Sequence, residues 1–144
     1  MKVAELIEGR TEVFSLADDT TVYDAARYLR GKEVRAVGIV DREGKLVGVL
    51  SQSDISNKVA AENKCPAWTR VNEIMSTELV TVGPEATLDE CLRLLEKSRI
   101  YHLLVIDEKL GYRGTISVQD LLKMSASDQK ARADMLEAYM FPQR

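Results

Sequence analysis

The chain of 144 residues contains few of the residues on which small catalytic or disulfide-linked domains depend. It has one histidine and two cysteines, and neither cysteine forms a motif with a second cysteine or with the histidine. A disulfide framework is therefore excluded, a structural zinc site is strongly disfavoured, and both thiols are expected to be reduced. No nucleophile with a paired base, no metal cluster and no phosphate-binding P-loop is apparent, so an enzyme is the least favoured class of function.

Long apolar runs and concentrated positive charge are also missing. No stretch approaches the roughly 18 consecutive apolar residues of a membrane-spanning helix. The start, "MKVAELIEGR", lacks the basic and then apolar order of a signal peptide. The net charge of −3, with both signs interspersed, disfavours nucleic acid as a partner. We therefore expect a cytoplasmic protein that contacts neither membrane nor nucleic acid.

The sequence does contain an internal repeat. A shift of 66 positions aligns residues 13–55 with residues 79–121 without a gap, so that "GVLSQSDI" from Gly48 falls on "GTISVQDL" from Gly114. Before these stretches "VAELI" resembles "VNEIM" at a shift of 68, which makes one connection two residues longer. The chain is therefore expected to consist of two copies of one unit.

The apolar pattern changes in the same order within each copy. A short β-branched stretch precedes an apolar stripe with helical spacing, over residues 22–29 and 88–95. Two apolar runs joined by an acidic turn follow, which predicts a β-hairpin, and then a further helix, over residues 55–61 in the first copy. Thr87 and Glu90 predict a capping box at one helix start. Each copy is thus expected to run strand, helix, strand, strand, helix.

The predicted fold class is α/β (α+β), built from two β-α-β-β-α repeats. A single three-stranded sheet cannot bury both of its faces, so the copies are expected to pack sheet to sheet with pseudo-twofold symmetry. Pro66 is expected to stop the preceding helix, and Trp68 to cover the edge of the core. The expected boundaries are repeat 1 at 1–62, a connector at 63–70, repeat 2 at 71–125 and a C-terminal helix or tail at 126–144.

The repeated serine and aspartate, Ser51 with Asp54 and Ser117 with Asp120, have two interpretations. Serine followed three residues later by aspartate is a shortened capping box, which maintains the fold and does nothing else. The glycine three residues before each serine favours a second interpretation, because a missing side chain lets another group approach the strand end. Unpaired N–H groups at a helix start bind phosphate oxygens, and an ionised aspartate accepts hydrogen bonds from a ribose diol.

These residues carry a resemblance to a known family. The series "VNEIM … LVTVGPEATLDECLRLLEKSRIYHLLVID … GTISVQDLL" resembles a CBS domain, and the duplicated chain resembles a tandem CBS pair, the Bateman module. The resemblance implies a cleft between the repeats that takes an adenosine-containing ligand: AMP, ADP, ATP, NAD or S-adenosylmethionine. It also implies pairing into a homodimer. The C-terminal helix, past the end of the resemblance, is expected either to cap the module's own core or to meet a second chain, and the second role is slightly favoured.

The resemblance implies two pseudo-equivalent ligand sites. One takes Ser51 and Asp54 from the first repeat, and its adenine side from the second repeat, at Thr81, Val82, Tyr101, His102 and Leu103. The other takes Ser117 and Asp120, with residues of the first repeat opposite, at Ser15, Leu16, Arg35, Ala36 and Val37. Arg35 and Arg99 are the cationic candidates for phosphate. Gly38 and Leu104 stand where the family usually has a proline.

The function expected is that of a regulatory module without catalytic activity. It would bind an adenine nucleotide or S-adenosylmethionine and sense metabolic state through the geometry of its dimer, with an unidentified regulated protein as a further partner. The alternative is a ligand-free structural module for protein–protein interaction, in which both aspartates only cap helices. No catalytic residue, metal ligand or catalytic cofactor is expected.

Overall fold

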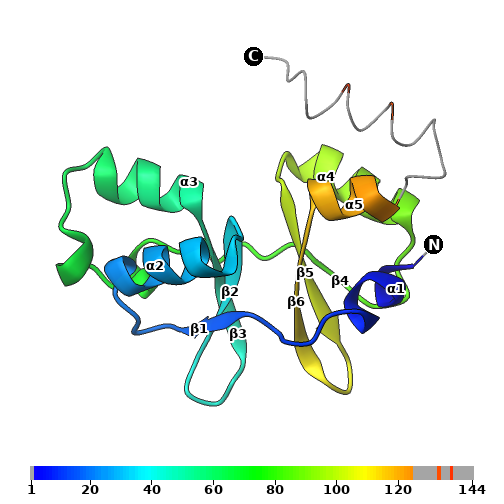
Figure 1. Cartoon of the computed structure of the whole chain (residues 1–144), viewed down its shortest axis with the longest axis horizontal. Coiled ribbons are helices and arrows are strands. Elements are labelled where there is room, and N and C mark those ends of the chain that lie inside the picture. Colours follow the sequence, from blue (N-terminus) through cyan, green and yellow to red (C-terminus); the bar gives the residue numbers. More distant parts are fainter. Residues whose placement is uncertain (1, 125–132, 134–136, 138–144) are drawn as a thin grey trace. The chain divides into compact units, whose positions relative to one another are not determined.

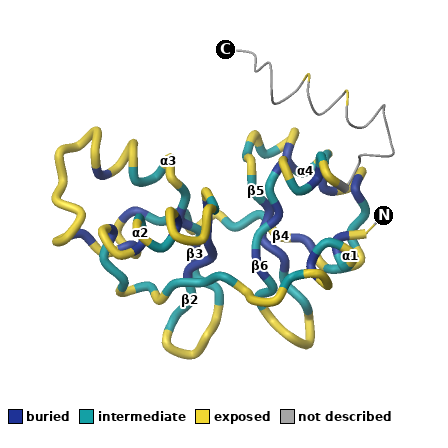
Figure 2. The backbone as a smooth tube through the Cα atoms, viewed as in Figure 1, coloured by how far each residue is buried: buried dark blue, intermediate teal, exposed yellow. Residues whose placement is uncertain are grey.

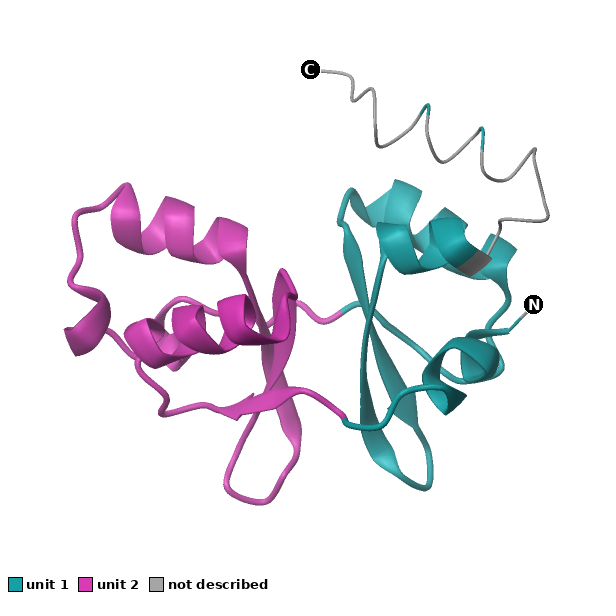
Figure 3. Ribbon diagram, in the orientation of Figure 1, with its two compact units in different colours: residues 1–12, 80–144 teal, residues 13–79 magenta. Residues whose placement is uncertain are grey.

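The computed structural model describes residues 2–124, 133 and 137. The chain forms two compact units, which Figure 3 colours separately. Unit 1 combines Met1–Glu12 with Val80–Arg144, and unit 2 is Val13–Leu79. The helix or tail expected over 126–144 lies outside the described residues, apart from positions 133 and 137.

Unit 2 contains a three-stranded sheet of order β1-β2-β3. Strand β1 pairs parallel with β2, and β2 pairs antiparallel with β3 through a tight connection. Figure 1 shows α2 and α3 on the same side of this sheet. The elements are β1 Ser15–Ala17, α2 Val22–Lys32, β2 Ala36–Val40, β3 Leu46–Ser51, α3 Gln52–Ile55, a π-helical turn η1 Ser56–Ala60, and the 3-10 turns η2 Pro66–Trp68 and η3 Val71–Glu73.

Unit 1 repeats this plan with a sheet of order β4-β5-β6. Strand β4 pairs parallel with β5, and β5 pairs antiparallel with β6. The elements are α1 Val3–Glu8, β4 Thr81–Val82, α4 Leu88–Ser98, β5 His102–Asp107, β6 Gly111–Ser117 and α5 Val118–Met124. The predicted α/β class and the two β-α-β-β-α repeats are therefore confirmed.

The two long helices begin and end as their sequences dictate. Thr21 caps α2 and Thr87 caps α4, each by accepting the N–H three residues later at 3.1 and 3.2 Å. Glu33 and Arg99 end these helices in the left-handed conformation, with φ of 57° and 54°. The apolar stripe between cap and end is buried in both helices, so the spacing identified in the sequence is the face turned to the core.

Each unit has its own hydrophobic core, shown in dark blue in Figure 2. Val3 and Ile7 of α1 are buried in the core of unit 1, together with residues of α4, β5 and β6. Val71, the equivalent of Val3, and Ile74, the equivalent of Leu6, are buried in the core of unit 2. Each unit thus holds the β-α-β-β-α series of one repeat and the first helical segment of the other.

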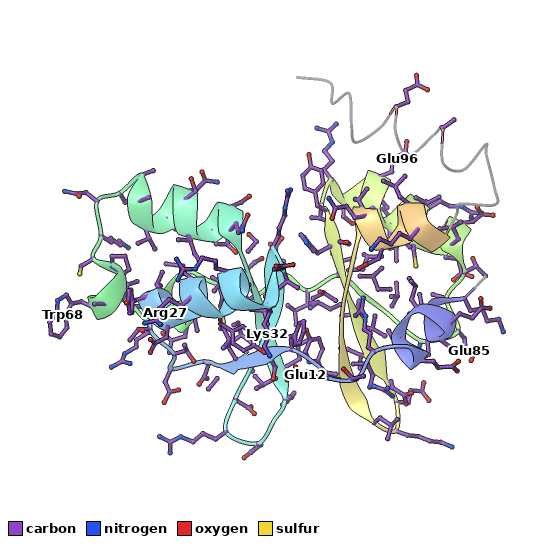
Figure 4. All side chains as sticks on the ribbon, viewed as in Figure 1. Glu12, Arg27, Lys32, Trp68, Glu85 and Glu96 are labelled. Carbon is purple, nitrogen blue, oxygen red and sulfur yellow. The ribbon has the colours of Figure 1, made fainter. Side chains whose placement is uncertain are left out.

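Backbone hydrogen bonds fix this exchange of segments. The Val3 N–H donates to the Ala86 carbonyl at 2.9 Å, and the Val71 N–H donates to the Thr20 carbonyl at 2.8 Å. Lys2 also pairs with Glu85 at 2.8 Å, and Figure 4 shows Glu85 beside α1. The two segments therefore enter their units in equivalent ways, even though α1 is an α-helix and η3 a single 3-10 turn.

The connector differs from the expectation at Trp68. Trp68 is 85% exposed and projects from the ribbon in Figure 4, so the prediction that it covers the core edge is wrong. The reason is the 3-10 turn: the Cys65 carbonyl accepts from Trp68 N–H and from the Thr69 hydroxyl, which turns Thr69 inward instead. The preceding helix ends before Pro66, where Asn63 adopts a φ of 54° and the Lys64 N–H bonds back to the Val59 carbonyl.

No helix in the described part of the chain is both long and apolar enough to cross a membrane.

Candidate functional site

Ser51 and Asp54 lie at the junction of β3 and α3. Ser51 is the last residue of β3 and the N-cap of α3. Its hydroxyl accepts from the Asp54 N–H at 3.2 Å, and its own N–H donates to Asp54 Oδ2 at 2.9 Å. The Ser51 hydroxyl also lies 3.1 Å from the same carboxylate oxygen. The pair therefore forms a complete capping box.

Ser117 and Asp120 repeat this geometry at the junction of β6 and α5. The Ser117 N–H donates to Asp120 Oδ2 at 2.8 Å, and the Asp120 N–H donates to the Ser117 hydroxyl at 3.1 Å. Both carboxylates are partly exposed, with side chains that are 15% exposed for Asp54 and 31% for Asp120. Each therefore holds its own helix start while remaining within reach of solvent.

In unit 2 the start of β2 lies beside Ser51. Ala36 pairs with Ser51, and the Gln52 N–H donates to the Arg35 carbonyl at 2.9 Å. Val37 is 1% exposed and belongs to the core, so its contribution to a ligand surface is limited to its backbone edge. Ser15 and Leu16 pair with Gly38 and Ile39 on the other side of β2. The expected residues of unit 2 thus share one sheet.

Unit 1 places the equivalent residues in the same way. His102 pairs with Ser117, and the Val118 N–H donates to the Tyr101 carbonyl at 3.1 Å. Tyr101 is exposed, whereas Leu103 is fully buried in the core. Thr81 and Val82 pair with the neighbouring residues Leu104 and Val105 of β5. Arg99 ends α4 in the left-handed conformation, two residues before Tyr101.

The structure therefore places the expected residues in two matched sets, one in each unit. Each expected site, by contrast, combines the serine and aspartate of one set with strand residues of the other set, and that combination stays a prediction. The matching is incomplete for the cations, because Arg35 is equivalent to Tyr101 and Arg99 to Glu33. Two N–H groups at each helix start already have partners: those of residues 52 and 118 donate to the carbonyls of Arg35 and Tyr101, and those of residues 54 and 120 donate to the capping serines. Fewer helix N–H groups therefore remain for an anionic ligand, which would depend more on cationic side chains.

Sequence reasoning missed two cations that contact Asp54 and Asp120, which we call the signature aspartates. Lys58 Nζ lies 3.2 Å from Asp54 Oδ1, and Arg10 Nη2 lies 3.2 Å from Asp120 Oδ2. Lys58 is four residues after Asp54, so the helical i, i+4 spacing is a signal that predicts this pair. Arg10 lies 110 residues from Asp120 and has no such signal.

Side chains of the protein itself lie close to the two repeated glycines, Gly48 and Gly114. A Cβ on Gly48 would lie 2.8 Å from Cγ of Met75 and closer still to its sulfur. A Cβ on Gly114, which has a φ of 113°, would lie 3.1 Å from Nη1 of Arg10. Met75 and Arg10 are thus the groups that approach the two glycines, so the glycines do not by themselves favour a ligand over the capping interpretation.

The CBS domain profile matches this chain twice, over residues 3–61 and 71–127. The CBS domain-containing protein CBSX3, mitochondrial, of Arabidopsis thaliana is 29% identical over 126 residues, which are 85% of this chain and 61% of that protein. This chain thus spans less than two thirds of that relative. An inosine-5'-monophosphate dehydrogenase of Nitrosopumilus maritimus is 31% identical over 108 residues, which are 75% of this chain but only 21% of the dehydrogenase. That match does not extend over the rest of the enzyme.

Solved structures share the fold. A protein with CBS domains from Burkholderia ambifaria MC40-6 superposes with a TM-score of 0.81 at 29% identity, covering 90% of this chain and 96% of that one. The CBS domain pair of protein MJ0100, solved in complex with 5'-methylthioadenosine and S-adenosylmethionine, gives a TM-score of 0.76 at 23% identity, covering 86% and 98%.

Proposed function

Because this chain belongs to the CBS domain family, we propose that it is a regulatory module that binds an adenosyl ligand, of the class of AMP, ADP, ATP, NAD or S-adenosylmethionine. The observation that carries the proposal is the pair of partly exposed carboxylates, each fixed beside a serine hydroxyl by an identical capping box. The complex of MJ0100 with two adenosyl compounds supports the ligand class.

The chemistry of the two sets fits the parts of such a ligand. Ionised Asp54 and Asp120 accept hydrogen bonds from the two hydroxyls of a ribose, and the serine hydroxyls add a donor and an acceptor. Arg35 and Arg99 supply charge for a phosphate or carboxylate group. The remaining proposed contacts to the base come from strand residues, at Ser15, Leu16, Ala36, Val37, Thr81, Val82, Tyr101, His102 and Leu103.

The regulatory part of the proposal is a change of assembly. The module pairs into a homodimer, and the ligand shifts the dimer between two geometries only if it binds them with different affinity. A regulated protein would respond to that shift. Sedimentation velocity with and without saturating ligand tests this change of dimer geometry. A changed sedimentation coefficient at unchanged mass supports the proposal.

A second function is favoured by one specific observation. Both aspartates already satisfy their own helix starts, as a ligand-free interaction module would require. The two functions predict different effects on ligand affinity when Asp54 or Asp120 is replaced by asparagine, its neutral isostere. Asparagine keeps an acceptor for the serine N–H but loses the charge-assisted bonds to a diol, each of which contributes about 1.5–3 kcal/mol.

The test is to titrate the protein and the variants Asp54→Asn and Asp120→Asn with AMP, ATP, NAD and S-adenosylmethionine by calorimetry. Recognition predicts that each variant weakens binding at its site by at least about tenfold while the melting temperature shifts little. The control is Thr87→Ala, which removes a helix cap outside both sets and should cost about 1 kcal/mol of stability with ligand affinity intact. Equal affinity in all four proteins would favour the capping function.

A further inference from the structure

Each signature aspartate is tied through one cation to the segment that leads into the other unit. In unit 2, Lys58 Nζ pairs with Asp54 Oδ1 at 3.2 Å and donates to the Ile74 carbonyl at 2.9 Å. Ile74 directly follows η3, and the chain enters unit 1 a few residues later, at Val80. Lys58 therefore joins the carboxylate to the start of a crossover segment.

In unit 1 the crossover segment itself supplies the cation. Arg10 lies between α1 and the entry into unit 2 at Val13. Its Nη2 pairs with Asp120 Oδ2 at 3.2 Å, and its Nη1 donates to the Thr115 carbonyl at 2.6 Å. Gly114 leaves the space that this guanidinium occupies. The two contacts of the Arg10 guanidinium thus hold residues 9–12 close to the end of β6.

The two cations come from positions that are not equivalent in the repeat. Both cations lie outside the aligned range of 13–55, and the same shift continued to residue 58 places Lys58 on a methionine, Met124. The two units therefore arrive at the same arrangement, a cation shared between the aspartate and a main-chain carbonyl, with different residues. The shared feature is the link between the carboxylate and the crossover segment.

We infer that an adenosyl ligand breaks two ion pairs when it binds, Arg10 with Asp120 and Lys58 with Asp54. We call each of these ion pairs a clasp. This inference rests on the proposed function, because the releasing group is the ribose diol. The diol donates to the same carboxylate that the cation contacts, and so competes with it. The side chains of Arg10 and Asp120 are both about one-third exposed, at 30% and 31%, so water already weakens their pair and displacement costs little. Release frees the crossover segment, which is how binding at the aspartate reaches the connection between the units.

The competition has a measurable consequence for affinity. Arg10→Gln removes the competitor, so AMP and S-adenosylmethionine should bind more tightly at the Asp120 site, by up to about fivefold, the limit set by a solvent-exposed ion pair. Arg93→Gln removes the same charge from an exposed position of α4 and should leave affinity unchanged. If Arg10 instead assisted the ligand, Arg10→Gln would weaken binding, and the inference would be overturned.

Hydrogen exchange of the full chain tests the release itself. In the ligand-free protein, Arg10→Gln and Asp120→Asn should each accelerate amide exchange in residues 9–12, and saturating AMP or S-adenosylmethionine should do the same in the wild type. Unchanged exchange in both variants overturns the clasp. Binding without faster exchange in the wild type also overturns it and leaves the proposed function standing. Absence of calorimetric binding of AMP, ATP, NAD and S-adenosylmethionine alike overturns the release together with the proposed function, so the two failures are distinguishable.

Discussion

At the scale of single residues, the two repeated glycines show how one sequence position serves different contacts. Gly48 lies in β3, where Ser76 forms a two-way backbone bridge with Val49 and brings Met75 over the strand. Gly114 lies in β6, where Arg10 takes the corresponding place with its side chain. Glycine is required at both positions. At Gly48 the reason is the close approach of Met75, and at Gly114 it is the close approach of Arg10 together with a positive φ.

Gly48→Ala should destabilise unit 2. The new Cβ would overlap the Met75 side chain, and forcing a methyl group into a packed site costs about 1–3 kcal/mol. Gly31→Ala is the matched control, because no atom lies within 4 Å of its Cβ position in α2 and alanine favours a helix by about 0.5–1 kcal/mol. Urea unfolding should therefore shift in opposite directions for the two variants. A Gly48→Ala protein as stable as the wild type would show that Met75 moves aside freely.

The two cysteines should differ in reactivity. Cys91 is completely buried in α4, and burial, with a smaller contribution from Glu90, raises its pKa to about 11 from an ordinary value of 9.0. Cys65 is exposed in the connector. Ellman's reagent at pH 8 should modify one thiol per native chain and two per chain in guanidinium chloride. The Cys65→Ser variant, which should show no fast reaction in the native state, assigns the reactive thiol.

The raised pKa of Cys91 also predicts that the free energy of unfolding falls at alkaline pH. The folded state holds the thiol proton more tightly than the unfolded state does, so the stabilisation is complete below pH 9 and is lost as the pH rises through about 11. Cys91→Ala should flatten this part of the stability curve, measured as the urea midpoint between pH 8 and 11. A wild-type midpoint with the same slope as that of the variant would contradict the assignment.

Residue-scale prediction from sequence succeeded where the signal was local. The spacing of Ser51 and Asp54 gave the capping box as one interpretation, and the apolar stripe over residues 88–95, which includes Cys91, predicted a buried helix face. It failed for Trp68, because a short 3-10 turn decides which of two neighbouring side chains faces inward. It missed Arg10, because only the folded chain brings residues 10 and 120 together.

At the scale of elements, the main feature is the exchange of first helical segments. The repeat predicted both β-α-β-β-α series, since periodicity and caps are properties of the local sequence. It did not predict that α1 packs in the unit formed by the second repeat, because the apolar face of α1 and that of η3 are similar, and similarity does not encode the partner. Backbone pairing of Val3 with Ala86 settles the choice in the structure.

Ile7→Ala tests the place of α1. Ile7 is 5% exposed in the core of unit 1, so its truncation should cost about 2–4 kcal/mol of unit 1 stability. Hydrogen exchange should rise in β5 and β6, and remain as in the wild type in β2 and β3. Glu8→Ala, at an exposed position of the same helix, serves as the control and should leave exchange in both sheets unchanged. Faster exchange in β2 and β3 alone would contradict the exchange of segments.

At the scale of the whole molecule, two units with separate cores are joined by two crossover segments, at residues 12–13 and 79–80. Arg10, just before the first of these connections, pairs with Asp120, and Lys58 joins Asp54 to the carbonyl of Ile74, which precedes the second. In the proposed account, a ligand bound at either aspartate would act on the connections between the units through these cations. The proposed regulatory function and the proposed clasps are therefore two parts of one account.

The measurement that tests this account most directly is calorimetric titration of the wild-type chain with AMP, ATP, NAD and S-adenosylmethionine. The account predicts saturable binding of at least one of them, lost when Asp54 and Asp120 are both replaced by asparagine. The absence of heat with all four compounds at millimolar concentration, or undiminished binding to the double variant, would contradict it.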